Sequence, residues 1–342
     1  MRMKKYRLLK HKYQQAKRAL IDAVVMRGYR KHFSQSLIIE PTNRCSLKCS
    51  CCPNGVAEGQ CRQRGVMSRQ TFDLVMAHLD VPVKKCFLHL CGEPFLNPDL
   101  DYFADQLLKR GISPVIFSNG YNIDLGLLDR ILQLRGFNIS FSMDMLSKEH
   151  YEEIRVPGHY EHALKSLAAI NETFARHKRF YGLNIIVPVM GCDDMHEVMR
   201  SLFEQYSNLN IISLSSRWPW PKLPSTGDLE GHLSAKPYIC RRFRDLPVVL
   251  WNGDVSFCNF DYTGEMKVGN ITQQSMKEIV NGSTARRIRR HLLMCQYERE
   301  SLCRECLWPR YDNFSLALRR RQFLAMNDDE QRELFERYYL NV

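Results

Sequence analysis

The sequence lacks the marks of a membrane-spanning or exported chain. It has no run of eighteen apolar residues, so no transmembrane helix is expected. The most apolar stretch near the N-terminus, residues 19–26, is interrupted by Asp22 and has no cleavage site, so no signal peptide is expected. These absences predict a cytoplasmic protein with reduced thiols. The thirteen cysteines among 342 residues therefore indicate metal binding or catalysis, with packing as the alternative for an isolated one.

Acidic residues are scarce at the N-terminal end. Residues 1–33 hold eleven Lys and Arg against one acid, Asp22, which gives +10 of the total net charge of +12. We predict a basic N-terminal helix over residues 1–35. It is either a solvated helix packed on the body or a weak contact for an anionic membrane surface or an acidic partner. Aromatic and basic residues are not interleaved there, so nucleic acid is not an expected partner.

Repeats and low-complexity tracts are also absent, and from residue 36 onward short apolar runs alternate with amphipathic segments. The predicted strands are 36–40, 86–90, 114–118, 138–142, 183–187 and 210–215. The predicted helices are 69–79, 100–110, 124–134, 160–174 and 193–206. This alternation is typical of an α/β fold with a parallel sheet, in which the residues after each strand line the active site.

The pattern changes at a Pro- and Gly-rich stretch, residues 218–231, which we interpret as a linker. We predict four parts: the basic helix 1–35, an α/β domain over 36–231, a cysteine-bearing module over 232–310 and a C-terminal helix over 311–342. In the last part, residues 327–330 resemble a capping box at the start of a helix.

Three cysteines, Cys45, Cys49 and Cys52, follow the first predicted strand with the spacing C-x3-C-x2-C. Three thiolates do not complete a structural zinc site, which takes four ligands. On a four-iron cluster they leave one iron open to an outside ligand. We interpret the additional Cys51 as a small packed side chain.

This loop resembles that of the radical S-adenosylmethionine (SAM) superfamily, and the resemblance extends over most of residues 36–310. It implies a partial (β/α)6 radical SAM barrel and a [4Fe-4S] cluster whose open iron binds SAM. In that family, SAM is cleaved to a 5′-deoxyadenosyl radical that abstracts a substrate hydrogen. The resemblance also implies an external electron donor such as flavodoxin or ferredoxin.

Further positions match the family's SAM-binding motifs. In "CGEP", Gly92 and Glu93 resemble the segment that holds the SAM ammonium, although Cys91 replaces the family's first glycine. A carboxylate there can accept a charge-assisted hydrogen bond. The other implied SAM contacts follow later strands: Ser118, Asn119, Ser142 and Arg155. The alternative for Arg155 is a surface charge on a helix.

Four later cysteines, Cys240, Cys258, Cys303 and Cys306, are spaced C-x17-C-x44-C-x2-C. Four thiolates saturate either a zinc ion or a four-iron cluster, and the spacing alone does not decide between them. With Gly253 before Cys258, the pattern resembles the auxiliary-cluster domains named SPASM and twitch. The resemblance implies a small C-terminal cysteine-rich domain with one auxiliary [4Fe-4S] cluster. Cys295 is left as a packed thiol, a substitute ligand or a hydrogen donor.

The reaction suggested by this resemblance is that of twitch-type aminoglycoside dehydrogenases, which oxidise a ring carbinol. The substrate would be a sugar or aminocyclitol-like small molecule, and the auxiliary cluster would take an electron. Arg217 after the sixth predicted strand is a candidate to orient the substrate hydroxyl, because arginine stays protonated. Asp193 or Asp194 is a candidate to accept its proton.

Three other functions remain open. A radical epimerase would need a thiol hydrogen donor, for which Cys192 and Cys295 are candidates against the alternative of buried inert thiols. A SPASM-type peptide or protein maturase is a second possibility, although residues 1–35 are short for a peptide-recognition domain. A zinc-stabilised binding module without catalysis is the third, and the three-cysteine loop argues against it.

Overall fold

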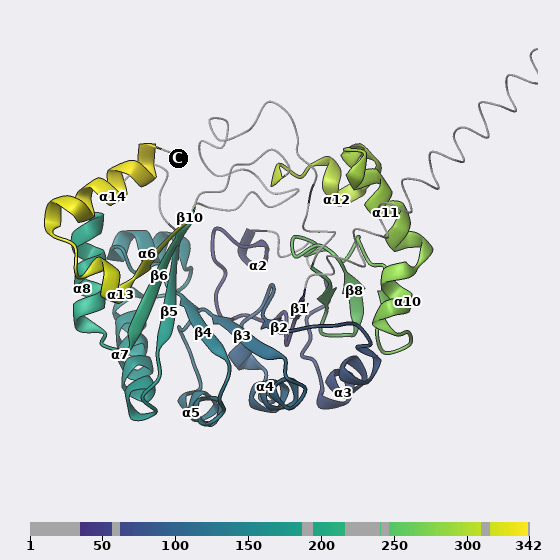
Figure 1. Ribbon diagram of the computed structural model, residues 1–342, viewed down its shortest axis with the longest axis horizontal. Coiled ribbons are helices and arrows are strands. Elements are labelled where there is room, and N and C mark those ends of the chain that lie inside the picture. Colours follow the sequence, from purple (N-terminus) through teal and green to yellow (C-terminus); the bar gives the residue numbers. More distant parts are fainter. Residues whose placement is uncertain are drawn as a thin grey trace, which may run out of the picture.

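A computed structural model describes residues 35–56, 62–186, 194–215, 240, 246–308 and 315–340. Their strands form a ten-stranded sheet in the order β10-β6-β5-β4-β3-β2-β1-β7-β8-β9 (Figure 1). The six strands from β1 to β6 are parallel. They are β1 (Ser36–Ile39), β2 (Lys85–Leu88), β3 (Ser113–Ser118), β4 (Asn138–Ser142), β5 (Tyr181–Ile186) and β6 (Leu209–Ser215). The prediction of a parallel α/β sheet is therefore confirmed, with strand ends shifted by one or two residues.

Five amphipathic helices cover one face of this sheet (Figure 1). They are α3 (Arg69–His78), α4 (Leu100–Lys109), α5 (Leu125–Gln133), α7 (Tyr160–Arg176) and α8 (Met195–Gln205). Side-chain caps fix two of their starts: Ser68 accepts from the Thr71 amide, and Asp124 accepts from those of Gly126 and Leu127. The helices pack on alternate strand residues such as Leu88, Ile116 and Phe141, all fully buried. The other strand residues therefore face away from the helices, into the partial barrel.

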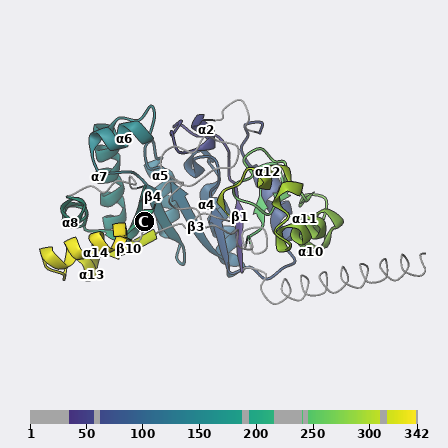
Figure 2. The same ribbon diagram turned by 90° about the horizontal axis from the view of Figure 1, so that it is seen from above.

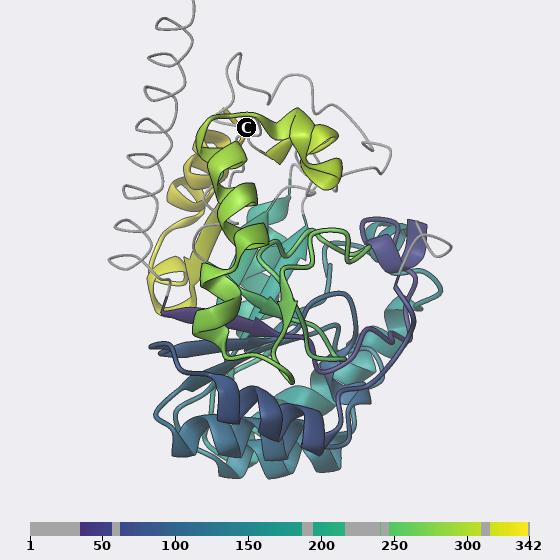
Figure 3. The same cartoon turned by 90° about the vertical axis from the view of Figure 1, so that its right-hand side faces the viewer.

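The cysteine-bearing module extends the same sheet. Its strand β7 (Val248–Val249) pairs in parallel with β1, and β8 (Asp254–Ser256) and β9 (Gly269–Asn270) follow in antiparallel order. The helices α10 (Met276–Asn281), α11 (Ser283–Leu293) and α12 (Ser301–Arg304) complete it. Figure 3 shows these green segments against the purple strand β1. The two parts of the chain thus share one sheet.

The turn between β7 and β8 requires a glycine at position 253. Its φ is +84°, a conformation that favours glycine, and a Cβ there would lie 2.6 Å from Cγ2 of Thr272. The following residues run through β8 to Cys258. The glycine therefore makes the tight turn that brings Cys258 back from the sheet.

The C-terminal segment differs from the prediction of helix throughout. Residues Ser315–Arg319 form strand β10, antiparallel to β6, before the helices α13 (Arg320–Phe323) and α14 (Asp328–Leu340). Five residues are too few for periodicity to separate a strand from a helix, and pairing with the edge of β6 decides the conformation. The predicted capping box is present, since Asn327 and Glu330 bond each other's backbone amides at 2.8 and 2.9 Å.

No helix within the described residues is long and apolar enough to cross a membrane. Residues 1–34 of the predicted basic helix and the whole predicted linker, residues 218–231, lie outside the described residues.

Candidate active site

The first cysteine loop lies at the carboxyl end of β1. Cys45, Cys49 and Cys52 precede the short helix α2 (Pro53–Val56), and a tight turn joins Cys49 to Cys52, whose amide donates to the Cys49 carbonyl at 3.1 Å. A Cβ on Gly55 would overlap the Cys49 carbonyl oxygen. Glycine therefore allows α2 to fold back directly on the cysteine turn.

Hydrogen-bond donors reach two of these sulfurs. Asn119 Nδ2 lies 3.5 Å from Cys45 Sγ, and Arg155 Nη1 lies 3.7 Å from Cys49 Sγ. Burial raises the pKa of Cys45 to about 11 and also raises the pKa values of Cys49 and Cys52. These thiols therefore stay protonated until a cation replaces their protons, as iron does. The donor set fits a cluster held by three thiolates.

The "CGEP" segment lies against this loop. A Cβ on Gly92 would overlap the Thr42 carbonyl oxygen and lie 2.8 Å from that of Arg44, so a larger residue would push the loop away. Asn54 Nδ2 donates to the Cys91 carbonyl oxygen. The segment and the cysteine loop are thus fitted to each other at backbone distance.

Glu93 is 3% exposed and joins the ends of β2 and β3. Its Oε2 accepts from the Asn119 amide at 2.6 Å, and its Oε1 accepts from the Phe95 amide at 3.1 Å, which caps η2 (Pro94–Leu96). Burial raises the pKa of Glu93, and these bonds oppose the shift, as does one from Ser118. Carboxylate oxygens retain further acceptor capacity for an ammonium group. The nearly buried Ser118 also accepts from the Gly120 amide, so it supports Glu93.

Arg155 follows the helix α6 (Lys148–Ile154) and is 7% exposed. It is therefore not a surface charge. Its Nε donates to Asp144 at 2.6 Å, and Asp144 in turn accepts from the Ile186 amide at 2.5 Å. Asp144, fully buried, was not predicted as a site residue, although the carboxylate in "FSMD" was a signal. The half-buried Ser142 lies on the strand face directed into the barrel.

The four later cysteines also come together. The pKa of Cys258 is raised by burial and by the neighbouring thiols of Cys240, Cys303 and Cys306. Within the described residues, no three Cys, His, Asp or Glu side chains converge closely enough to ligate one metal ion. The four thiols are thus near enough to one another to interact, and four thiolates can hold either a zinc ion or a four-iron cluster.

Cys295 lies beside this group but is exposed. The Tyr297 hydroxyl accepts from the Cys240 amide at 3.2 Å and lies 3.8 Å from Cys295 Sγ. Cys295 is therefore not a buried packed thiol.

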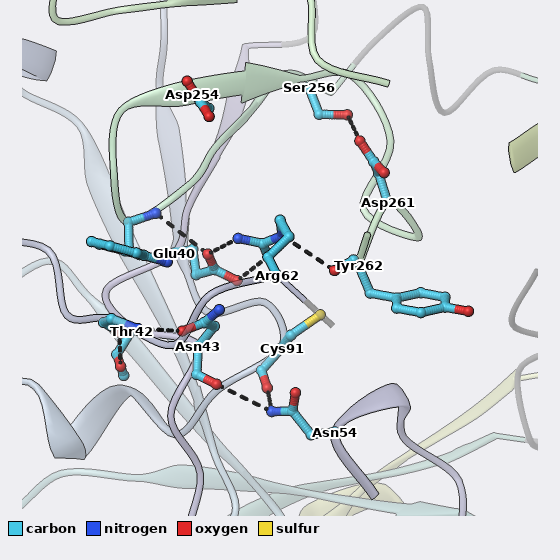
Figure 4. A network of polar contacts seen from close by, with 12 residues as sticks. Glu40, Thr42, Asn43, Asn54, Arg62, Cys91, Asp254, Ser256, Asp261 and Tyr262 are labelled. Carbon is cyan, nitrogen blue, oxygen red and sulfur yellow. Dashed lines mark hydrogen bonds and ion pairs between the residues drawn. The ribbon is translucent and has the colours of Figure 1, made fainter. Parts of the chain in front are cut away.

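A polar network connects the two cysteine regions (Figure 4). Arg62 donates to both oxygens of the fully buried Glu40 at 2.8 and 3.0 Å, and its Nε donates to the Tyr262 carbonyl at 3.2 Å. The Trp251 amide donates to Glu40 at 3.3 Å. Burial disfavours the charge of Arg62, but Glu40 outweighs burial and raises its pKa. Glu40 precedes the first cysteine loop and Tyr262 follows Cys258, so this ion pair links both.

His89 is a candidate that the sequence analysis did not identify. It follows β2 on the face directed into the barrel. The centroid of its ring lies 4.8 Å from that of Phe117 and 6.0 Å from that of Phe87. Its ring nitrogens form no hydrogen bond within the described part of the chain. Burial lowers the pKa of His89 to about 4, so the imidazole is neutral at pH 7. The only signal for His89 in the sequence is its polar side chain within the apolar run of the predicted strand 86–90.

Cys192, Asp193 and Arg217 lie outside the described residues. Asp194 is at the start of α8 and forms no side-chain cap.

Comparison with known proteins identifies both parts of the chain. Residues 39–202 match the radical SAM superfamily, and residues 240–307 match SPASM, an iron–sulfur cluster-binding domain. The chain is therefore a radical SAM enzyme and belongs to that superfamily. It carries an SPASM domain, and its cofactors are SAM, a SAM-binding [4Fe-4S] cluster and an auxiliary iron–sulfur cluster.

Individual relatives are distant. The chain is 26% identical over 187 residues to the tungsten-containing aldehyde ferredoxin oxidoreductase cofactor-modifying protein of Pyrococcus furiosus, over 52% of this chain and 50% of that protein. The match thus spans about half of that relative's length.

Solved structures of similar fold have lower identities. BtrN in complex with AdoMet and 2-DOIA is 18% identical, with a TM-score of 0.54 over 80% of this chain and 92% of BtrN. SuiB of Streptococcus suis bound to the precursor peptide SuiA is 14% identical, with a TM-score of 0.59 over 81% of this chain and 72% of SuiB. At such identities, the likeness shows the fold alone.

Proposed function

We propose that this enzyme oxidises a carbinol of a sugar or aminocyclitol-like small molecule to a ketone. The observation that supports this most is the second cysteine group, in which the thiols of Cys240, Cys303 and Cys306 lie near enough to Cys258 to raise its pKa. A cluster saturated by four protein thiolates has no open iron for a substrate, so electron transfer is the role left to it. Net oxidation needs such an electron acceptor. BtrN, which has a similar fold, has a crystal structure in complex with AdoMet and 2-DOIA.

When bound, the cofactors supply two capacities: cluster-bound SAM provides hydrogen-atom abstraction, and the auxiliary cluster accepts one electron. Flavodoxin or ferredoxin is the proposed external electron donor. Gly92, Glu93, Asn119, Ser142 and Arg155 are proposed to hold SAM, in line with their places around the first cysteine loop. Glu93 suits the ammonium and Arg155 the carboxylate of SAM.

The remaining requirement is a group that takes the hydroxyl proton, and His89 suits it. Asn119, directly after β3, contacts Cys45, and Phe117, two residues earlier in β3, contacts the His89 ring. His89 is thus linked through β3 to the contact with the first cysteine loop. A substrate there loses a hydrogen atom from carbon, a proton to His89 and an electron. These losses balance the conversion of an alcohol to a ketone.

Two alternatives remain distinct in their chemistry. An epimerase returns a hydrogen atom from a thiol, for which Cys192 and Cys295 are the candidates. The exposed Cys295 lies beside the second cysteine group, next to Cys240. A peptide maturase acts on a peptide, as the complex of SuiB with its precursor peptide illustrates.

The test uses the full chain, reconstituted without oxygen and supplied with SAM, a chemical reductant and a panel of aminocyclitols deuterated at the carbinol carbons. We expect a product that has lost the carbinol deuterium and the hydroxyl hydrogen, with the deuterium recovered in 5′-deoxyadenosine. The Cys258→Ala variant should still cleave SAM but form no ketone. In a parallel reaction of unlabelled aminocyclitols in D2O, a product of unchanged oxidation level that gains one deuterium would refute dehydrogenation in favour of epimerisation. Turnover of peptides but of no polyol would favour the maturase.

His89→Gln tests the proton acceptor separately. We expect it to retain deuterium transfer to 5′-deoxyadenosine while ketone formation falls by about 10²-fold or more. Wild-type ketone formation in this variant would exclude His89 without affecting the proposed reaction.

A further inference from the structure

The C-terminal end of α6 is joined to the first cysteine loop by backbone hydrogen bonds, and Figure 2 shows α6 and α2, the helix that follows this loop, on the same side of the molecule. The Lys48 amide donates to the Val156 carbonyl at 2.6 Å, and the Ser50 amide donates to the Ile154 carbonyl at 3.0 Å. Arg155 lies between these two carbonyls and contacts Cys49 Sγ. The backbone on both sides of Cys49 is therefore fixed to the C-terminal end of α6.

Tyr151 lies one helical turn before Arg155 in this support. Its side chain is fully buried, and its hydroxyl has no hydrogen-bond partner in the described structure. A buried hydroxyl without a partner costs free energy, and such groups are rare in folded proteins. A phenylalanine would avoid this cost. The hydroxyl therefore calls for an acceptor that is not part of the folded chain.

The surroundings of the hydroxyl restrict what this acceptor is. Besides burial, the groups that act electrostatically on Tyr151 are Arg155, Tyr121, Cys49 and Asp144. Arg155 and Asp144 are already bonded to each other and to Cys49 and Ile186. Burial raises the pKa of Tyr151, so the hydroxyl stays a neutral donor at physiological pH. A neutral donor suits the sulfur atoms of an iron–sulfur cluster attached to Cys49.

We propose that the Tyr151 hydroxyl donates a hydrogen bond to the SAM-binding cluster at its Cys49 corner and thereby raises the reduction potential of that cluster. A donor on a cluster sulfur stabilises the reduced form, which carries more negative charge. Tyr151 is thus a positioning residue. Its role requires Cys49 to be a cluster ligand but is independent of the substrate and of the proposed oxidation.

The test is a potentiometric titration of the reconstituted full chain, followed by electron paramagnetic resonance without SAM. In Tyr151→Phe, we expect the potential of the SAM-binding cluster to fall. At a fixed potential, the ratio of reduced to oxidised cluster should drop about five- to tenfold, and tenfold equals about 59 mV for one electron. The auxiliary cluster serves as an internal reference and should not change.

Tyr160→Phe is the matched control, because the Tyr160 ring packs edge-on against Tyr151 at 5.9 Å between centroids. It should leave both potentials unchanged. The apo protein gives a second readout. Since the hydroxyl has no partner there, apo Tyr151→Phe should melt at the wild-type temperature or above it. A merely structural hydroxyl would lower that temperature.

Three results would overturn the proposal: an unchanged potential in Tyr151→Phe, a change seen only after SAM is added, or a lower melting temperature of the apo variant. The second would mean that the hydroxyl serves SAM instead of the cluster. If Tyr151→Phe does not retain iron, the same titration is made with 2,3-difluorotyrosine at position 151. This residue keeps the shape and is a stronger donor, so the potential should rise.

Discussion

The buried ion pair between Arg62 and Glu40 gives the most direct test of how the two cysteine regions are joined. In Arg62→Met, Glu40 loses two of its three donors and keeps only the Trp251 amide at 3.3 Å. The Tyr262 carbonyl also loses its bond from Arg62. The exposed fractions of the two side chains are 12% for Arg62 and 0% for Glu40, so water cannot replace the lost donors.

Removing one partner of such a pair costs about 3–5 kcal/mol. Methionine retains an aliphatic stem against Gly264, so most of this cost comes from the isolated carboxylate. The double variant Glu40→Gln/Arg62→Met removes that charge and should recover about 2 kcal/mol or more. Because both groups are buried, 1 M salt should change these differences little.

The assay is urea unfolding of the reduced apo protein, with iron content of the reconstituted protein as a second measurement. Arg130→Met is the control, because it removes a shorter but more exposed ion pair, to Asp101 at 2.6 Å, and should leave the unfolding free energy unchanged within error. A loss below about 1 kcal/mol in Arg62→Met, or no recovery in the double variant, would refute the argument from burial.

Two further predictions concern the barrel side of the site. Gly92→Ala should push the first cysteine loop away from Thr42, so iron assays should find about four irons in place of about eight. Retention of all iron would contradict this. His89→Phe should flatten the pH dependence of stability. Because burial lowers the His89 pKa from 6.5 to about 4, only the unfolded chain binds this proton between those pH values. Wild-type stability therefore falls as pH drops from 6.5 to 4, by at most about 3 kcal/mol from this group. Equal slopes in urea unfolding from pH 7 to pH 4 would contradict this.

Much of the fold was predictable because its signals are local. The apolar runs of β1 to β6 and the amphipathic helices between them have clear periodicity, and caps such as Asn327 with Glu330 lie within one turn. The cysteine spacings also lie within short segments, so the order of residues along the chain is enough to indicate the clusters.

The features that were missed depend on contacts between distant segments. Arg62 bonds a carbonyl 200 positions away, and β10 becomes a strand only by pairing with β6. Asp144 had a local signal in "FSMD", but nothing local distinguishes Tyr151 from other polar residues of amphipathic helices. Their importance comes from burial next to Cys49, which the chain creates only when folded.

The place of β7 beside β1 also has a consequence for biosynthesis. The amides of Ile38 and Glu40 bond the carbonyls of Pro247 and Val249 at 3.0 and 2.9 Å. On the ribosome, β1 therefore lacks one neighbour until about two hundred further residues have been translated. Throughout this interval the segment that carries Cys45, Cys49 and Cys52 is already synthesised but has an open flank. Delivery of iron and sulfide to the nascent chain has its widest access then, before the second half of the protein closes over β1.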